Sequence, residues 1–177
     1  MAGQFAGRSF AVNEAVRATT GSTYSPDRPS PATVEQARHA ANQAAATFPA
    51  WSGMAPTERR AILNRAADLL LEQAEAFARV ISLEIGGTRQ WSDLNCRLGA
   101  SMLREAAALT TQISGETIPS DRPGTLSLAM RQPCGVVLSM APWNAPIVLA
   151  VRGIAVPLAC GNTVVLKASE LCPQTHD

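Results

Sequence analysis

Two short apolar runs, separated by one helix-length segment, constrain the fold of this chain more than any other feature of its sequence. The first run, 136–138, predicts a strand buried on both faces of a parallel sheet. The second run, 163–166, follows a segment with apolar residues at helical spacing that begins at Pro146, which suits the first turn of a helix. Gly161 follows this expected helix, at a position where glycine tolerates a positive φ. The stretch 134–170 therefore predicts a strand–helix–strand unit with two parallel strands.

Polar side chains gather where each of these strands is expected to end. Trp143 and Asn144 follow the first strand, and Lys167, Ser169 and Glu170 follow the second. In open α/β sheets, ligands bind outside the carboxyl ends of the strands. We therefore predict a binding site at this edge of the sheet.

The charge balance and the lack of long apolar runs argue against several classes of partner. The 177 residues include 15 basic and 14 acidic side chains with a net charge of +1, so we expect neither nucleic acid nor an anionic membrane as partner. No apolar stretch reaches the roughly 20 residues of a membrane span. The N-terminus lacks the apolar core of a signal peptide, so we expect a cytoplasmic protein.

The cysteines and histidines form no pattern typical of a metal site. The four cysteines are Cys96, Cys134, Cys160 and Cys172. They contain no CxxC pair, which favours reduced thiols over disulfides or a zinc site, and we assign none of them to catalysis. His39 and His176 are expected to be solvated or structural.

The chain ahead of the strand–helix–strand unit is predicted to be a scaffold of helices that follows a loosely ordered arm at residues 1–32. Thr33 and Gln36 match a capping box, which predicts a helix from there to about residue 47, ended by Pro49. Further helices are expected from residue 56 to 85 and over 88–113. The apolar side chains expected to turn the last helix toward the core are Trp91, Leu94, Leu98, Met102, Ala106, Leu109 and Ile113.

The stretch 116–131 alternates in a way that is typical of a small β-ribbon. Leu126, Leu128 and Met130 lie on one face of the expected second strand. A ribbon with one apolar face is a candidate oligomerisation arm, and an ordinary covered hairpin is the alternative. The fold class that follows is α/β: N-terminal helices and a β-ribbon lead into the first strands of a Rossmann-like parallel sheet.

With these segments in view, the chain resembles the N-terminal part of the aldehyde dehydrogenase superfamily. The resemblance rests on the segments 48–51, 84–88, 131–137, 142–146 and 161–170, in that order. Within the superfamily, the chain is most similar to the salicylaldehyde and vanillin dehydrogenases. The resemblance implies that residues 33–177 form the N-terminal part of an NAD(P)-binding domain, as an incomplete aldehyde dehydrogenase fold. It also implies a small-molecule aldehyde as substrate and a homo-oligomer for the full-length enzyme.

The implied reaction is the NAD(P)-dependent oxidation of an aldehyde, in this case an aromatic one, to a carboxylic acid. In such enzymes a cysteine thiolate adds to the aldehyde, and Asn144 would donate its side-chain NH₂ to the resulting oxyanion. The residue chemistry leaves an alternative, in which Asn144 caps the helix that opens at Pro146.

The resemblance further implies that Lys167 and Glu170 bind the ribose hydroxyls of the cofactor, since an ammonium donates hydrogen bonds and a carboxylate accepts them. Glu170 would repel a 2′-phosphate, which favours NAD over NADP, although Lys167 would attract that phosphate. Ser169 would add a hydroxyl beside Glu170. The residues expected to line the cofactor channel are Met140, Ala141, Pro142 and Trp143. The alternatives are a solvated Lys167–Glu170 pair and a buried, structural Trp143.

The pyrophosphate motif, the general-base glutamate and the nucleophilic cysteine of the family belong to later sequence. We therefore expect this chain to be a truncated N-terminal fragment that is inactive alone, because a nucleophile and its base act as a unit. Two parallel strands alone would also leave an uncovered, apolar sheet. A non-catalytic fragment that binds a nucleotide or a full-length subunit is the alternative function.

Overall fold

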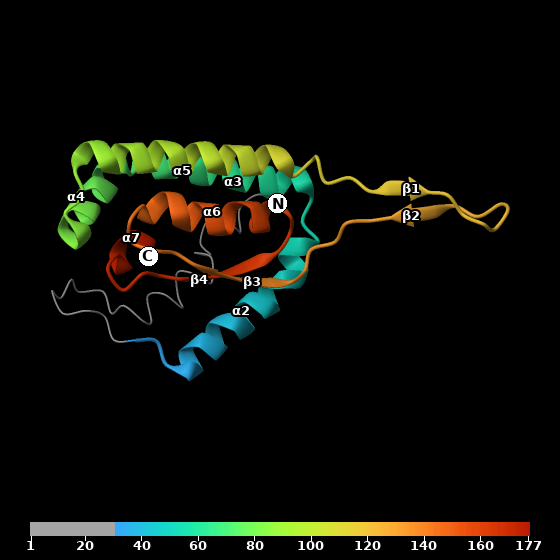
Figure 1. Cartoon of the computed structure of the whole chain (residues 1–177), viewed down its shortest axis with the longest axis horizontal. Coiled ribbons are helices and arrows are strands. Elements are labelled where there is room, and N and C mark those ends of the chain that lie inside the picture. Colours follow the sequence, from blue (N-terminus) through green and yellow to red (C-terminus); the bar gives the residue numbers. More distant parts are fainter. Residues whose placement is uncertain (1–30) are drawn as a thin grey trace, which may run out of the picture.

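The computed structural model describes residues 31–177, so nearly all of the arm predicted at residues 1–32 lies outside the described residues. The elements in chain order are α2 (Val34–Ser52), α3 (Pro56–Glu72), α4 (Ala74–Ile85), α5 (Arg89–Leu109), β1 (Glu116–Ile118), β2 (Ser127–Ala129), β3 (Val136–Met140), α6 (Pro146–Ala159), β4 (Thr163–Lys167) and α7 (Pro173–His176). Figure 1 shows α3 and α5 side by side above α6, with the β3–β4 sheet beneath α6 and α2 below the sheet. The predicted α/β class is confirmed.

The predicted strand–helix–strand unit is confirmed as β3, α6 and β4. The two strands are parallel, and their register pairs Val136 with Thr163 at one end and Met140 with Lys167 at the other. Pro146 occupies the first turn of α6. Gly161 follows the helix with a φ of 84°, in the left-handed region that only glycine adopts readily. The local sequence signals were therefore sufficient to define this unit.

Asn162 fastens the start of β3 to the end of α6. Its Oδ1 accepts hydrogen bonds from the backbone N–H groups of Cys134 at 2.7 Å and Gly135 at 3.0 Å, and its Nδ2 donates to the carbonyl of Pro157 at 3.1 Å. The side chain is buried. The side-chain oxygen therefore satisfies two backbone N–H groups that no regular element pairs, while the carbonyl of Pro157 also accepts the backbone N–H of Asn162 at 3.0 Å.

The expectation that the first strand is buried on both faces was wrong. Leu138 is 64% exposed and Met140 is 72% exposed, whereas β4 is largely buried. α6 covers the face of the sheet that carries Ser139 and Leu166, and α2 contacts the other face through a hydrogen bond from Thr163 Oγ1 to the carbonyl of Ala44. Because that contact lies at the start of β4, the far end of the same sheet face is left open.

We expected the first helix to end before Pro49, and this was wrong: the helix continues to Ser52. The capping box of Thr33 and Gln36 is present as predicted. Beyond Pro49, the last turn is held by Trp51, which is 5% exposed and donates from Nε1 to the carbonyl of Leu158 at 3.0 Å. Tertiary contact thus outweighs the backbone hydrogen bond that a helical proline removes.

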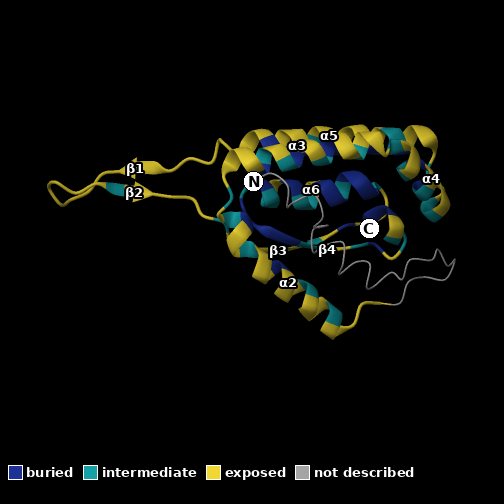
Figure 2. Cartoon of the chain, turned by 180° about the vertical axis from the view of Figure 1, so that it is seen from behind, coloured by how far each residue is buried: buried dark blue, intermediate teal, exposed yellow. Residues whose placement is uncertain are grey.

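The buried face of α5 is only partly the one predicted: Ala106 is buried and Met102 packs against the core, but most of the predicted side chains are not buried. The large apolar side chains at Trp91, Leu94, Leu98 and Leu109 are between 37% and 46% exposed, and Figure 2 shows the outer side of α5 as largely exposed. The buried positions of this helix are Ser92, Asn95, Cys96, Gly99, Ala100, Leu103, Ala106 and Ala107.

Close packing against α6 explains why this small-residue face of α5 is turned inward. A Cβ placed on Gly99 would lie 3.0 Å from Ile147 Cγ2 and 3.0 Å from Leu70 Cδ2. Larger side chains would therefore keep the two helices apart. The main core consists of this seam together with Leu63, Ala67 and Ile81.

The predicted ribbon is present as an antiparallel pair of β1 and β2, with Thr117 opposite Leu128. Figure 1 shows it extending away from the helices and the sheet. Leu126, Leu128 and Met130 are 72%, 56% and 74% exposed. Residues 31–177 therefore leave the ribbon uncovered, and the oligomerisation arm and the covered hairpin both stay predictions.

Candidate functional site

The two predicted clusters of polar residues lie at neighbouring strand ends. Met140, the last residue of β3, pairs with Lys167, the last residue of β4. The backbone N–H of Ala141 then donates to the carbonyl of Lys167 at 3.1 Å. The turn that carries Asn144 and the segment that carries Glu170 therefore begin at adjacent points of one sheet edge, as the parallel topology predicted.

Asn144 is exposed at the surface of this turn, and the helix-capping alternative for it was wrong. The residue that precedes α6 as its N-cap is Ala145, and no side chain caps that end of the helix. A backbone N–H of the first turn is instead reached from α5: Val148 donates to Oδ1 of the buried Asn95 at 3.5 Å. The side-chain amide of Asn144 therefore takes no part in capping α6.

Lys167 and Glu170 form an exposed ion pair. Lys167 Nζ lies 3.5 Å from Glu170 Oε2, and the two side chains are 59% and 60% exposed. An exposed pair at this distance contributes little to stability, typically under about 1 kcal/mol. The arrangement places three N–H donors of an ammonium beside carboxylate acceptors, which suits a ligand with neighbouring hydroxyl groups.

The other predicted cofactor residues differ in their exposure. Met140, Pro142 and Trp143 are exposed, and the exposed fraction of Trp143 is 50%, so the alternative of a buried aromatic was wrong. Ala141 is buried against Leu166. Ser169 is 4% exposed, and its Oγ accepts the N–H of Leu171 at 3.2 Å, so its hydroxyl oxygen stabilises the turn. The cofactor contacts assigned to these residues stay predictions.

His176 lies between the two loops of the site and was expected only to be solvated or structural. Its Nδ1 accepts the backbone N–H of Ser169 at 3.1 Å, and its Nε2 lies 3.1 Å from the carbonyl oxygen of Pro146. Burial lowers the pKa of His176, the charge of Lys167 lowers it further, and the hydrogen bond to Pro146 opposes both effects. No sequence motif indicated this contact; the only signal was a histidine near the predicted site.

Glu84 holds the helix that carries His176. Its carboxylate accepts the backbone N–H groups of Gln174 at 2.6 Å and Thr175 at 3.1 Å, together with the hydroxyl of Thr175. This residue was quoted above for the family resemblance, without a structural role. Its role here is to anchor α7 to the end of α4.

The four cysteines are all free thiols, and each is unsuited to act as a nucleophile beside Asn144, either by its position or by its burial. Burial raises the pKa of Cys96 and, with the charge of Glu84, raises the pKa of Cys172 to about 12. Cys134 precedes β3, whereas Asn144 follows it. Cys160 follows α6, a helix of 14 residues and therefore about 20 Å long, and Asn144 precedes that helix.

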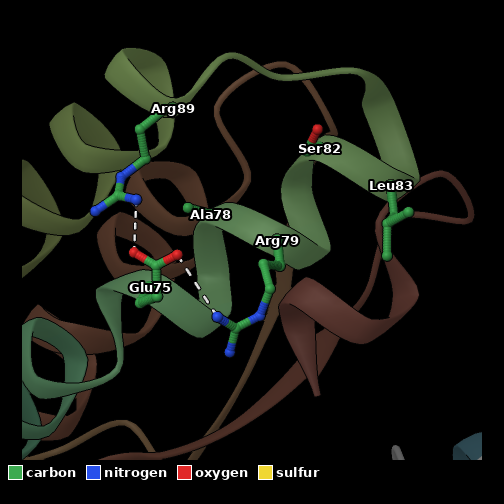
Figure 3. A pocket seen from close by; sticks show the side chains of 6 residues that line it. All are labelled: Glu75, Ala78, Arg79, Ser82, Leu83 and Arg89. Carbon is green, nitrogen blue, oxygen red and sulfur yellow. Dashed lines mark ion pairs between the residues drawn. The ribbon is translucent and has the colours of Figure 1, made fainter.

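A surface hollow of about 430 Å³ lies elsewhere, on α4 and the start of α5. Figure 3 shows Glu75 between Arg79 and Arg89, and these ion pairs measure 3.5 Å and 2.5 Å. The hollow contains none of the predicted site residues, and both of its arginines are paired with Glu75. We therefore place the candidate site at the strand ends.

Residues 31–177 contain no cluster of three or more histidine, cysteine or acidic side chains that could hold a metal ion. Within the same residues, no helix has both the length and the apolar character needed to cross a membrane.

Comparison with known proteins gives consistent results. The model of the aldehyde dehydrogenase family matches residues 15–176. Over 145 residues, 82% of this chain and 30% of the relative, the chain is 57% identical to a vanillin dehydrogenase from Pseudomonas sp. (strain HR199 / DSM 7063). A solved salicylaldehyde dehydrogenase from Pseudomonas putida G7, in complex with salicylaldehyde, is 48% identical with a TM-score of 0.79, over 82% of this chain and 30% of that one. An NAD-dependent benzaldehyde dehydrogenase from Corynebacterium glutamicum is 33% identical with the same TM-score of 0.79, over 82% of this chain and 32% of that one.

Proposed function

The chain belongs to the aldehyde dehydrogenase family, and from this premise we propose that it supplies the oxyanion donor and the ribose-binding groups for the NAD(P)-dependent oxidation of an aromatic aldehyde to a carboxylic acid. The chain spans about 30% of the length of the curated relatives it matches, so this activity is proposed for a protein in which these residues take part. The observation that carries the proposal is the pairing of Met140 with Lys167, which brings the turn of Asn144 and the Lys167–Glu170 pair to one sheet edge.

Asn144 is proposed to bind the oxygen of the aldehyde as it becomes an oxyanion. The side chain is exposed and is not engaged in capping α6, so its NH₂ group is available to donate. A fixed donor aimed at a developing oxyanion stabilises the transition state more than the ground state, and one such donor is typically worth about 10²–10³ in turnover.

Lys167 and Glu170 fit the ribose of NAD. The carboxylate accepts from a hydroxyl and the ammonium donates to one, and both groups are open to solvent beside each other. The negative charge of Glu170 disfavours a 2′-phosphate, so NAD binds more tightly than NADP. The positive charge of Lys167 attracts that phosphate, so NADP still binds, although more weakly than NAD. When bound, the dinucleotide supplies the hydride acceptor.

The attacking thiol is proposed to come from outside these 177 residues. Cys172 and Cys96 are buried with raised pKa values, and a thiol that stays protonated is a poor nucleophile. Cys134 and Cys160 lie at the opposite ends of β3 and α6 from Asn144. The isolated 177-residue chain is therefore expected to show no turnover, and turnover by the purified chain would overturn this part of the proposal.

The test is to express the complete coding frame that contains these residues and to measure formation of reduced dinucleotide. The substrates are vanillin, salicylaldehyde, benzaldehyde and an aliphatic aldehyde for comparison. We expect aromatic aldehydes to be oxidised with NAD, and Asn144→Ala to lower kcat by about 10²–10³ with an unchanged KM for NAD. Asn64→Ala, an exposed asparagine on α3, is the matched control and should leave kcat unchanged. Wild-type turnover by Asn144→Ala, or no reduced dinucleotide from any aldehyde, would refute the proposal.

A second proposal concerns subunit contact through the ribbon of β1 and β2. The apolar side chains of Leu126, Leu128 and Met130 are exposed, and an unpaired ribbon edge offers backbone groups to another chain. We expect Leu128→Asp to shift the protein toward a smaller oligomer in sedimentation analysis. An unchanged sedimentation coefficient would argue against this ribbon as an oligomerisation arm.

A further inference from the structure

The imidazole of His176 lies between the two loops that carry the proposed site. It accepts the N–H of Ser169, which lies between Lys167 and Glu170 in sequence. It also contacts the carbonyl of Pro146, two residues after Asn144. His176 is 8% exposed, so neither contact competes freely with water.

The two contacts define which nitrogen carries the proton. The backbone N–H of Ser169 donates, so Nδ1 must present its lone pair. The carbonyl of Pro146 accepts, so Nε2 must carry the hydrogen. Only the neutral imidazole with its proton on Nε2 satisfies both loops. Protonation would direct an N–H of His176 at the N–H of Ser169.

Cys172 also contacts both of these loops. Its thiol lies 3.7 Å from the carbonyl oxygen of Trp143, and its backbone N–H donates to the carbonyl of Ser169 at 3.2 Å. The backbone N–H of His176 donates in turn to the carbonyl of Cys172 at 3.2 Å. The turn before α6 and the segment after β4 are therefore fastened by adjacent groups of one short stretch.

The charged groups around His176 come from the elements that pack against α7. From α4, Glu84 is engaged with the backbone of α7, while Glu75 and Arg79 are paired with each other. From β4, the positive charge of Lys167 disfavours protonation of His176. The remaining charged groups are Glu170, Asp177 and Arg152, all of them exposed; Arg152 is the one charged residue of α6.

We propose that His176 is a positioning residue, which holds the Lys167–Glu170 segment at a fixed distance from the Asn144 turn by bridging Ser169 and Pro146. The inference rests on the proposed function, because it assigns to His176 the alignment of the nucleotide-binding pair with the oxyanion donor. Loosening the bridge lets Lys167 and Glu170 move relative to the turn, and NAD binds more weakly.

The experiment uses the 177-residue chain with ¹⁵N-labelled histidine, which gives only two imidazoles to assign because the sequence contains two histidines. We expect the resonances of His176 to show a bare Nδ1 and a protonated Nε2. This state should persist at a pH below 6.5, where an ordinary imidazole is protonated. His39→Gln assigns the spectrum and is the matched control, since His39 is exposed on α2. A proton on Nδ1 at neutral pH would overturn the bridge.

Binding of NAD is measured by calorimetry with the same His176 and His39 variants in the protein expressed from the complete coding frame, because the chain spans about 30% of the length of its curated relatives and the pyrophosphate motif is expected in later sequence. His176→Asn keeps an acceptor near Nδ1, and His176→Gln keeps a donor near Nε2, so each variant loses one contact. We expect each to weaken NAD binding about tenfold, and His39→Gln to bind as wild type does. As the pH is lowered, the affinity of the wild-type protein for NAD should fall as His176 becomes protonated. The affinity of His176→Gln for NAD should not show this fall.

The outcomes separate the two proposals. Intact NAD binding by wild type with equal binding by both His176 variants overturns the positioning role alone. Absence of NAD binding by wild type, with the expected His176 resonances, overturns the cofactor site on which that role rests. If one variant fails to fold, the affinity of the wild-type protein for NAD at falling pH is the deciding measurement. An affinity that stays constant while His176 becomes protonated overturns the inference.

Discussion

Replacing Asn162 with alanine is expected to lower the free energy of unfolding by about 3 kcal/mol. The side chain is 7% exposed and makes three hydrogen bonds, to the N–H groups of Cys134 and Gly135 and to the carbonyl of Pro157. A typical intramolecular hydrogen bond contributes about 1 kcal/mol net, and the N–H groups of Cys134 and Gly135 add a desolvation cost where water cannot reach them. The carbonyl of Pro157 adds no such cost, because it still accepts the backbone N–H of residue 162.

Asn162→Asp separates the contributions of these bonds. A carboxylate oxygen still accepts from Cys134 and Gly135, but the second oxygen then faces the carbonyl of Pro157. We expect this variant to lose about 1–2 kcal/mol, less than the alanine variant.

The assay is urea unfolding followed by tryptophan fluorescence, with the free energy obtained by linear extrapolation. Asn64→Ala, at an exposed position of α3, is the control and should stay within about 0.5 kcal/mol of wild type. The reasoning is refuted if Asn162→Ala loses less than about 1 kcal/mol, or if the aspartate variant is the less stable of the two.

Three further predictions follow from other parts of the structure. The pKa of His176 is lowered on folding, so its contribution to stability is present above pH 6.5 and is lost as the pH falls through the lowered folded-state value; urea unfolding against pH should show this slope in wild type, and a flatter one in His176→Gln. Iodoacetamide should label the exposed Cys134 in the folded protein and the buried Cys172 only on unfolding, and equal native labelling rates in mass spectrometry would contradict the burial described. A Cβ on Gly115 would clash with the backbone carbonyl oxygen of Ala129, so Gly115→Ala should remove hydrogen-exchange protection from the ribbon, and protection equal to wild type would argue against this contact.

The parts of the fold that were predicted correctly depend on signals close together in sequence. Pro146 at the start of α6 and Gly161 after its end define that helix by backbone chemistry alone. The parallel arrangement of two strands joined by one helix then brings the turn of Asn144 and the segment after Lys167 to one sheet edge. The position of these two segments was therefore predictable from topology, and the roles of their residues stay predictions.

The parts that were wrong depend on distant partners. The face of α5 was assigned by the size of its apolar side chains, yet the inward face is the one where Gly99 lets α6 approach closely. α2 continues through Pro49 because Trp51 binds the end of α6, more than a hundred residues away in sequence. No local pattern in the sequence reports such contacts.

The bridging role of His176 was missed for a related reason. A single histidine near the end of a sequence has no periodicity that indicates its neighbours. Its two partners, Ser169 and Pro146, contribute only backbone atoms, and backbone atoms carry no sequence signal.

The contacts of α2 also determine when this helix can dock during synthesis. Its hydrogen bond to Thr163 joins residues 119 positions apart, and the bond from Trp51 to Leu158 joins residues 107 apart. At about 5–20 residues per second, the ribosome takes roughly 6–24 s to make the chain between Ala44 and Thr163. During that interval α2 has no docking site. Only Ala44 and Trp51 of this helix are buried in the folded chain, so these are the side chains of α2 that wait uncovered until α6 and β4 have been made.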